Sequence, residues 1–158
     1  MRPLLFLLAV VLVGCSSKST ESEPSASAGA GASDPKAYLD KAAAQPGAVR
    51  TPSGLVYREL RAGSGESPKA SDTVKVNYRG TLPDGTEFDS SYKRNEPAQF
   101  PLSQVIPCWT EGVQKMKVGG KSELVCPASI AYGDRGSPPV IPGGATLIFE
   151  VELLKIGG

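Results

Sequence analysis

The last two thirds of the chain consist of short runs in which apolar and polar residues alternate. In residues 72–82, every second position from Val74 to Tyr78 is apolar and the positions between them are polar. A period of two puts one set of side chains on each face of a strand, so this run predicts a half-buried strand. The same kind of pattern, bounded by turn residues, predicts strands at residues 53–60, 86–91, 98–102, 121–127 and 145–156.

One later segment has helical spacing. In residues 108–120, Trp109, Val113 and Met116 are separated by four and three positions, which places them on one face of a helix. Gly119 and the glycine after it are expected to end this helix. A helix with one apolar stripe must bury that stripe, and the predicted sheet is the surface available to it.

A second, shorter helix is predicted in residues 34–48, ahead of the strands. Ser33 or Asp34 can cap it, Pro35 suits its first position, and Pro46 with the following glycine ends it. Its apolar face is small, so the pattern leaves open whether this helix docks on the domain or frays.

Together these elements indicate an α+β fold: a twisted antiparallel sheet of about five strands around one short α-helix. Residues 49–158 form the domain, and a domain of that size can bury a substantial core. Residues 34–48 are the short helix and lead-in to this domain.

The first residues are typical of a targeting segment. Arg2 precedes the apolar stretch Leu4–Val13, which is too short to span a bilayer and suits the core of a secretory signal in residues 1–14. The ending "LVGC" resembles the lipobox of bacterial lipoproteins, which implies cleavage before Cys15 and acylation of that cysteine. Two or three acyl chains would hold the protein on a membrane. The alternative is an ordinary signal peptide, with Cys15 incidental.

Residues 15–33 are predicted to be a lipidated N-terminus and a disordered tether, because this stretch has no aromatic and no large aliphatic side chain. Ser16 after the cysteine resembles the sorting pattern of lipoproteins in the outer membrane, facing the periplasm. Without Arg2 the 17 basic residues become 16 and balance the 16 acidic ones, so attachment to a membrane would rest on the lipid and not on charge.

Composition excludes several classes of chemistry. The chain has no histidine and a net charge of +1, which removes the commonest general base and metal ligand and leaves no basic footprint for nucleic acid. Residues 133–144 are rich in glycine but open no helix and contain no Lys-Ser/Thr pair, so they are no phosphate loop. We expect neither a metal nor a cofactor.

Two cysteines remain if Cys15 is acylated. Cys108 opens the predicted helix at 108–120, and Cys126 ends a strand. An extracytoplasmic compartment permits a disulfide between them, which would pin that helix to the sheet. Two buried free thiols are the alternative.

Three segments carry a resemblance to a known family. "VKVNYRGTLPDGTEFDSSYKRNEPAQF", "VIPCWTEGVQKMKVGGKSELVCP" and "IAYGDRGSPPVIPGGATLIFEVELLKI" resemble the FKBP-type peptidyl-prolyl cis-trans isomerases, in the order of that family and over residues 54–156. "QPGAVRTPSGLVYREL" is similar to the lead-in of secreted bacterial members of the Mip type. The long helical dimerisation arm of larger Mip-like proteins has no counterpart here.

The resemblance implies a pocket for a proline ring. Trp109 would be its floor, and Asp89 and Tyr132 its polar rim. The walls would be formed by Tyr78, Phe88, Val105, Ile106 and Phe149, and Val140 and Ile141 would line one edge. Arg94 would pair with Asp89, and the Tyr132 hydroxyl and the Ile106 N–H would donate to substrate carbonyls. Asp89, Tyr132, Phe88 and Trp109 are the residues implied in catalysis.

Each of these residues also has a simpler interpretation. Tyr132 and Trp109 could be plain core residues, Asp89 a turn carboxylate, and Arg94 a solvated loop charge. The chain also departs from the family at Ala98, where an aromatic residue is common, at Ser137, where a larger residue is common, and in the shorter segment between Phe100 and Val105. These changes affect contacts with the residues that flank a proline and with drugs.

The resemblance implies an enzyme that isomerises X–Pro bonds in polypeptides folding in the bacterial envelope and that binds macrolides such as rapamycin. No bond is broken in this reaction, which agrees with the absence of a nucleophile pair. A holdase-type binding module that uses the same groove without turnover is the alternative from another class. A host-interaction factor is a third.

Overall fold

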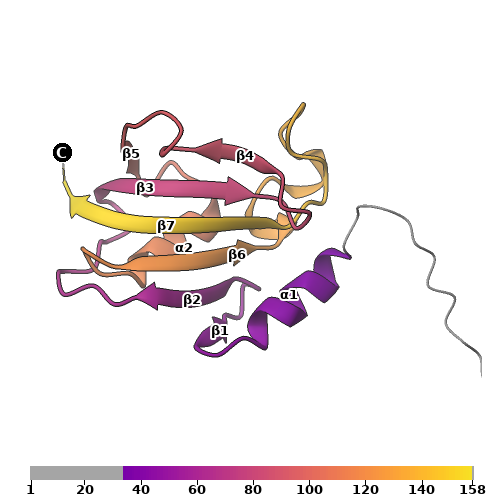
Figure 1. The fold of residues 1–158 in the computed structure, drawn as a ribbon, viewed down its shortest axis with the longest axis horizontal. Coiled ribbons are helices and arrows are strands. Elements are labelled where there is room, and N and C mark those ends of the chain that lie inside the picture. Colours follow the sequence, from indigo (N-terminus) through magenta and orange to yellow (C-terminus); the bar gives the residue numbers. More distant parts are fainter. Residues whose placement is uncertain (1–33, 158) are drawn as a thin grey trace, which may run out of the picture.

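The computed structural model describes residues 34–157, so the predicted signal, Cys15 and the tether lie outside the described residues. The described chain forms one antiparallel sheet with the strand order β1-β2-β6-β7-β3-β4, and β5 also pairs with β3 (Figure 1). The strands are β1 (Ala48–Arg50), β2 (Val56–Arg61), β3 (Thr73–Thr81), β4 (Glu87–Ser90), β5 (Ala98–Pro101), β6 (Lys121–Cys126) and β7 (Leu147–Ile156). The helices are α1 (Pro35–Ala43) and α2 (Pro107–Gln114), and η1 (Ala128–Ile130) and η2 (Gly133–Arg135) are single 3₁₀ turns.

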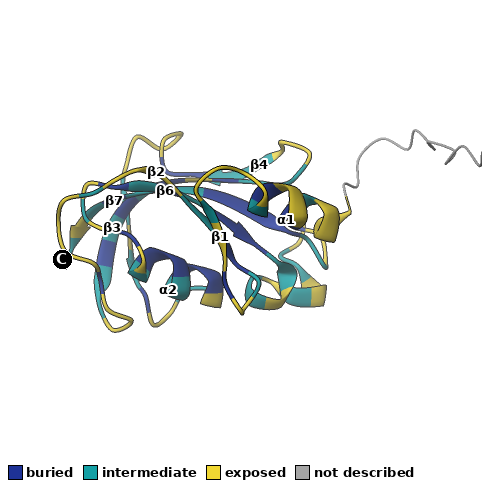
Figure 2. Cartoon of the chain, turned by 90° about the horizontal axis from the view of Figure 1, so that it is seen from below, coloured by how far each residue is buried: buried dark blue, intermediate teal, exposed yellow. Residues whose placement is uncertain are grey.

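The core lies between one face of the sheet and α2. Alternation along β3 and β7 puts Val74 to Tyr78 and Leu147 to Leu153 on this face, and these side chains are buried as the sequence predicts. Helix α2 contributes Trp109 and Val113 to the same cluster. Figure 2 shows α2 lying against the sheet with its buried residues toward the strands. The α+β fold class is therefore confirmed.

Helix α2 is shorter than the sequence predicts. It ends at Gln114 and not at Gly119, because the Lys115 and Met116 N–H groups bond to carbonyls three residues back. That closing turn is tighter than an α-helix. Met116 is still buried in the core cluster, since the turn after the helix keeps its side chain on the same side. The expected apolar stripe exists, but its last member lies beyond the helix.

The sheet has seven strands where the sequence predicts about five. Strand β1 is the addition that no pattern indicated, because it is three residues long and its exposed Val49 breaks any apolar alternation. It is held by antiparallel pairing with β2, in which Val49 lies opposite Tyr57. A strand this short at the edge of a sheet is stabilised by pairing with its neighbour more than by the β-propensity of its own residues.

Helix α1 docks on the opposite face of the sheet from α2. The Asp34 side chain accepts a hydrogen bond from the Lys36 N–H at 2.9 Å, which caps the helix as predicted. Leu39 and Ala42 are buried against Val56, Val125 and Ile148 in a second apolar cluster. The open question between docking and fraying is thus answered in favour of docking.

A disulfide joins Cys108 in the first turn of α2 to Cys126 at the end of β6. Both residues are fully buried. The bond links the helix that carries Trp109 to the strand that leads into the η1 and η2 turns. No helix among residues 34–157 is long and apolar enough to cross a membrane.

Candidate active site

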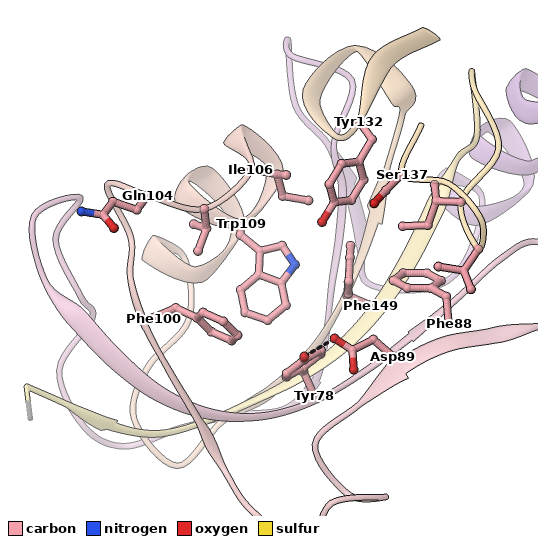
Figure 3. A pocket seen from close by; sticks show the side chains of 13 residues that line it. Tyr78, Phe88, Asp89, Phe100, Gln104, Ile106, Trp109, Tyr132, Ser137 and Phe149 are labelled. Carbon is pink, nitrogen blue, oxygen red and sulfur yellow. Dashed lines mark hydrogen bonds between the residues drawn. The ribbon is translucent and has the colours of Figure 1, made fainter. Parts of the chain in front are cut away.

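A cavity of about 490 Å³ opens between α2, the concave face of the sheet and the loop after η2. Its wall residues come from β3, β4, β5, β7, α2 and two loops, so segments far apart in sequence enclose it (Figure 3). The lining residues are Tyr78, Phe88, Asp89, Phe100, Gln104, Val105, Ile106, Trp109, Tyr132, Ser137, Val140, Ile141 and Phe149. Most of this surface is aromatic or aliphatic, which suits an apolar ring.

Trp109 forms the floor of the cavity. Its ring centroid lies 5.3 Å from those of Tyr78 and Phe149 and 5.5 Å from that of Phe100, each in an edge-to-face arrangement. Such contacts hold the rings in fixed orientations. The Trp109 side chain is therefore both core and pocket surface, because the floor of the cavity is the top of the core.

The Trp109 indole N–H has no oxygen or nitrogen acceptor among the described residues, although it is buried. Figure 3 shows this nitrogen directed toward the ring of Phe149. An N–H group above an aromatic face makes a weak hydrogen bond, which offsets part of the cost of burial.

The polar side of the rim is a three-residue network. The Tyr78 hydroxyl donates to the Asp89 carboxylate, Arg94 donates to Asp89 Oδ1 at 2.6 Å, and Arg94 also donates to the Tyr78 hydroxyl at 3.1 Å. The Arg94 guanidinium lies 5.8 Å from the centre of the Tyr78 ring. Asp89 lines the cavity, whereas Arg94 lies behind it and does not.

This network keeps the Asp89 carboxylate charged. Burial opposes that charge, but hydrogen bonds from Tyr78 and Arg94 and the nearby guanidinium outweigh it, so the pKa of Asp89 lies below its ordinary value of 3.8. Burial, followed by the hydrogen bond to Asp89, raises the pKa of Tyr78 above 10.0. The rim therefore presents a carboxylate neutralised by a guanidinium and a protonated phenol at ordinary pH.

Ile106 and Tyr132 lie side by side at the cavity and carry two further hydrogen-bond donors (Figure 3). Ile106 precedes α2 with extended backbone angles, and its N–H makes no backbone hydrogen bond within the described residues. Tyr132 stands at the start of η2 and is 41% exposed, and Figure 3 shows its hydroxyl pointing into the cavity. The Tyr132 hydroxyl is therefore available to a hydrogen-bond acceptor bound in the cavity.

The segment after Tyr132 is a shaped loop and not a loose linker. Ser137 and Ile141 pair with each other through hydrogen bonds of 2.8 and 3.0 Å, which closes a small hairpin whose exposed tip includes Val140. Gly136 has φ +65°, and a Cβ there would lie 2.3 Å from the Ile141 carbonyl oxygen. Only glycine fits such a backbone at that distance.

All but one of the residues that the resemblance placed in the pocket line this cavity. The exception is Arg94, which acts on it only through Asp89 and Tyr78. Three lining residues were not among them: Phe100, Gln104 and Ser137. Gln104 is exposed and polar, so no apolar pattern could have indicated it, although its place next to Val105 was a usable signal. Ala98 does not reach the cavity.

No cluster of acidic or cysteine side chains within residues 34–157 is arranged to hold a metal ion. The cavity instead offers a flat aromatic floor, apolar walls and a few oriented hydrogen-bond groups. Such a site can hold a small ring and orient the amide next to it, without attacking a bond.

These features define a family. Residues 64–154 match the family model described as FKBP-type peptidyl-prolyl cis-trans isomerase, and the chain belongs to that family. Within the family it groups with bacterial FkpA and Mip-like members.

The matches to individual proteins support this grouping. The chain is 54% identical over 121 residues to the isomerase FkpA of Escherichia coli, covering 77% of this chain and 44% of that protein. It is 46% identical over 121 residues to the isomerase Mip of Coxiella burnetii, covering 77% and 53%. The chain thus spans about half the length of these relatives.

Solved structures agree with the fold. The crystal structure of FkpA from Escherichia coli superposes with a TM-score of 0.76 at 53% identity, covering 78% of this chain and 57% of that one. A peptidyl-prolyl cis-trans isomerase from Pseudomonas syringae superposes with a TM-score of 0.74 at 36% identity, covering 78% and 91%.

Proposed function

We propose that this protein catalyses cis-trans isomerisation of X–Pro bonds in polypeptides, without a covalent intermediate or a cofactor. The observation that carries the proposal is the cavity itself. It has an aromatic floor at Trp109, the Asp89 carboxylate paired with Arg94 at its rim, and the Tyr132 hydroxyl pointing into it. The N–H of the lining residue Ile106 has no backbone acceptor within residues 34–157. Family membership and curated relatives named as peptidyl-prolyl cis-trans isomerases support the same reaction.

The physical task is to lower a rotational barrier. Amide resonance gives the peptide bond a barrier of roughly 18–20 kcal/mol, and isomerisation of X–Pro bonds is correspondingly slow. Resonance separates charge between oxygen and nitrogen, so water stabilises the planar amide more than the twisted one. Seating the proline on Trp109 removes that water and favours the twisted state.

The residues at the rim then stabilise the twisted amide through hydrogen bonds that they hold in a fixed orientation. Donors that fit the carbonyls in the twisted state better than in the planar state lower the barrier. Ile106 N–H and the Tyr132 hydroxyl are assigned this task, Phe88 closes the pocket over the ring, and Asp89 supplies a fixed field. Asp89 is already ionised and its bonds are occupied, so it does not transfer a proton.

The test is acceleration of X–Pro isomerisation by the purified protein in a protease-coupled assay with a proline-containing chromogenic peptide. We expect a rate above the spontaneous one, and inhibition by rapamycin, which should occupy the same cavity. Peptide binding without acceleration would instead support a holdase-type module. If the protein neither binds the peptide nor accelerates its isomerisation, both the isomerase and the holdase-type module are refuted.

We propose further that the protein is anchored by lipid at Cys15 in the bacterial envelope, in the outer membrane facing the periplasm. The signal-like Leu4–Val13 stretch and the Gly14-Cys15-Ser16 sequence support an anchored lipoprotein. The Cys108–Cys126 bond gives independent support, because disulfides persist in oxidising compartments outside the cytoplasm.

Labelling of cells with a fatty-acid analogue tests the anchor. We expect incorporation in the native protein and none in Cys15→Ser, which should also fail to sediment with membranes. Incorporation in Cys15→Ser, or none in either protein, would contradict the anchor.

A further inference from the structure

Gly80 lies near the end of β3, where that strand pairs with β4 on one side and with β7 on the other. It is the second-last residue of β3 and is buried, at a position where a glycine weakens a strand and contributes no side-chain packing. Its φ is not in the left-handed region, so backbone conformation does not require glycine there. A glycine inside a strand without such a requirement indicates that another group approaches the backbone closely.

The groups that approach Gly80 are two walls of the cavity. A Cβ at this position would lie 2.5 and 2.7 Å from ring atoms of Phe88 and 3.0 Å from the ring of Phe149. Contacts below 3.0 Å require one partner to move, and the Phe88 ring would have to give way. The space that a methyl group would fill is therefore occupied by these rings.

The strand register explains why both rings meet over this residue. Gly80 lies directly opposite Phe149 on β7 and directly opposite Asp89 on β4. The β3–β4 register shifts just after Gly80, next to the pairing with Glu87, and this irregularity lets the Phe88 ring lie over the glycine. The two rings then meet edge-to-face with centroids 5.5 Å apart.

The Phe149 ring connects this wall of the cavity to the floor at Trp109. Phe149 makes a second edge-to-face contact, with Trp109, so a shift of Phe149 would also move the surface on which the proline rests. Figure 3 shows Phe88 and Phe149 beside the Asp89 carboxylate at one side of the cavity. Gly80 itself does not line the cavity.

We propose that Gly80 is a positioning residue of this site: its missing side chain seats Phe88 and Phe149 and so sets the width of the proline pocket. The inference rests on the proposed isomerase function for its kinetic consequence, but its structural part stands without it. A side chain at residue 80 would push Phe88 away from Phe149 and spoil the fit of the ring while leaving Asp89, Ile106 and Tyr132 present.

Gly112 provides a matched control. A Cβ at Gly112 would lie 2.7 Å from Leu124, which is as tight a contact in the same core, but Leu124 does not line the cavity. Gly80→Ala and Gly112→Ala should therefore both lower the midpoint of urea unfolding. Gly80→Ala should weaken ligand binding by the larger factor, because the clash at Gly112 involves Leu124 and neither Phe88 nor Phe149.

The experiment measures kcat and KM with a proline-containing peptide, and the Kd of rapamycin from the fluorescence of the single tryptophan, Trp109. For Gly80→Ala we expect KM and Kd to rise roughly tenfold with a smaller change in kcat, the signature of lost binding. NMR contacts between the Phe88 and Phe149 rings should weaken in the same variant. That readout needs no activity, so it separates failure of this inference from failure of the proposed function.

A second pair of variants removes the clash. Leucine at residue 88 lacks the distal ring atoms that residue 80 would meet, so Phe88→Leu and Gly80→Ala/Phe88→Leu should have KM values within about twofold of each other. The double variant also serves if Gly80→Ala alone does not fold. The proposal would be overturned if folded Gly80→Ala kept the rapamycin Kd and the contacts between the Phe88 and Phe149 rings unchanged. It would also be overturned if adding Gly80→Ala raised KM by the same factor in the native protein and in Phe88→Leu.

Discussion

Reduction of the Cys108–Cys126 bond should destabilise the protein by an amount that its loop length predicts. The two cysteines are 18 residues apart in sequence and are joined across α2 and β6. In the chain-entropy model, closing a loop of that size removes entropy from the unfolded chain worth about 3 kcal/mol at 25 °C. Reduction removes no heavy atom, so it does not create the cavity that a substitution by a smaller residue would leave.

The measurement is urea unfolding followed by circular dichroism, with and without reductant. With an m-value of about 1.5 kcal/mol/M, a loss of about 3 kcal/mol lowers the unfolding midpoint by about 2 M. The variant Cys108→Ala/Cys126→Ala is the control, because its midpoint should not respond to reductant. Mass spectrometry after alkylation without reductant should find neither Cys108 nor Cys126 modified.

Two results would refute this reasoning. Two alkylatable thiols in the soluble protein would mean that the bond does not form. A midpoint shift equivalent to less than about 1 kcal/mol in an oxidised protein would mean that the unfolded chain is not restrained as the loop-entropy model requires. The bond lies beside Trp109, so reduced protein should also lose isomerase activity at a lower temperature than oxidised protein.

Three further predictions concern the cavity. Asp89→Ala should lower kcat/KM in the peptide assay while the circular dichroism spectrum stays native, and unchanged activity would remove Asp89 from the mechanism. Trp109→Leu should raise KM and lower kcat/KM by at least about tenfold, since it deletes the floor, and a peptide titration showing native KM would contradict this. Activity should be flat between about pH 5 and 8, because no histidine titrates there. A bell-shaped activity profile centred near neutrality would contradict this expectation of flat activity. Because the pKa of Asp89 is lowered, the stability that the ionised carboxylate contributes is complete above pH 3.8 and is lost only as the pH falls through the lowered pKa.

Periodicity predicted the parts of the fold in which burial alternates strictly. The buried face of β7 from Leu147 to Leu153 could be read directly from the sequence, and so could the face of β3. Strand β1 could not, because its three residues are placed by pairing with β2. The end of α2 was misplaced because Met116 keeps the apolar spacing after the helical hydrogen bonds have stopped.

The pocket could not have been predicted from periodicity at all. Trp109 and Phe149 look like core residues because they are core residues, and nothing local distinguishes the layer of the core that is open to ligand. The resemblance to a family supplied that distinction residue by residue. It could not supply Gln104, an exposed residue that borders the cavity only because of the turn that leads into α2.

The site depends on long-range pairing, and this explains which residues away from the substrate should matter. Phe149 and Asp89 meet at the cavity only because β7 and β4 both pair with Gly80 on β3. Trp109 meets them only because α2 is held on the sheet, and the disulfide fixes its first turn to β6. Loop closure must precede such contacts, so no wall of the pocket exists before the whole sheet has formed. Substitutions of Gly80, Cys108 or Cys126 should therefore change ligand binding through geometry, although none of these three residues lines the cavity.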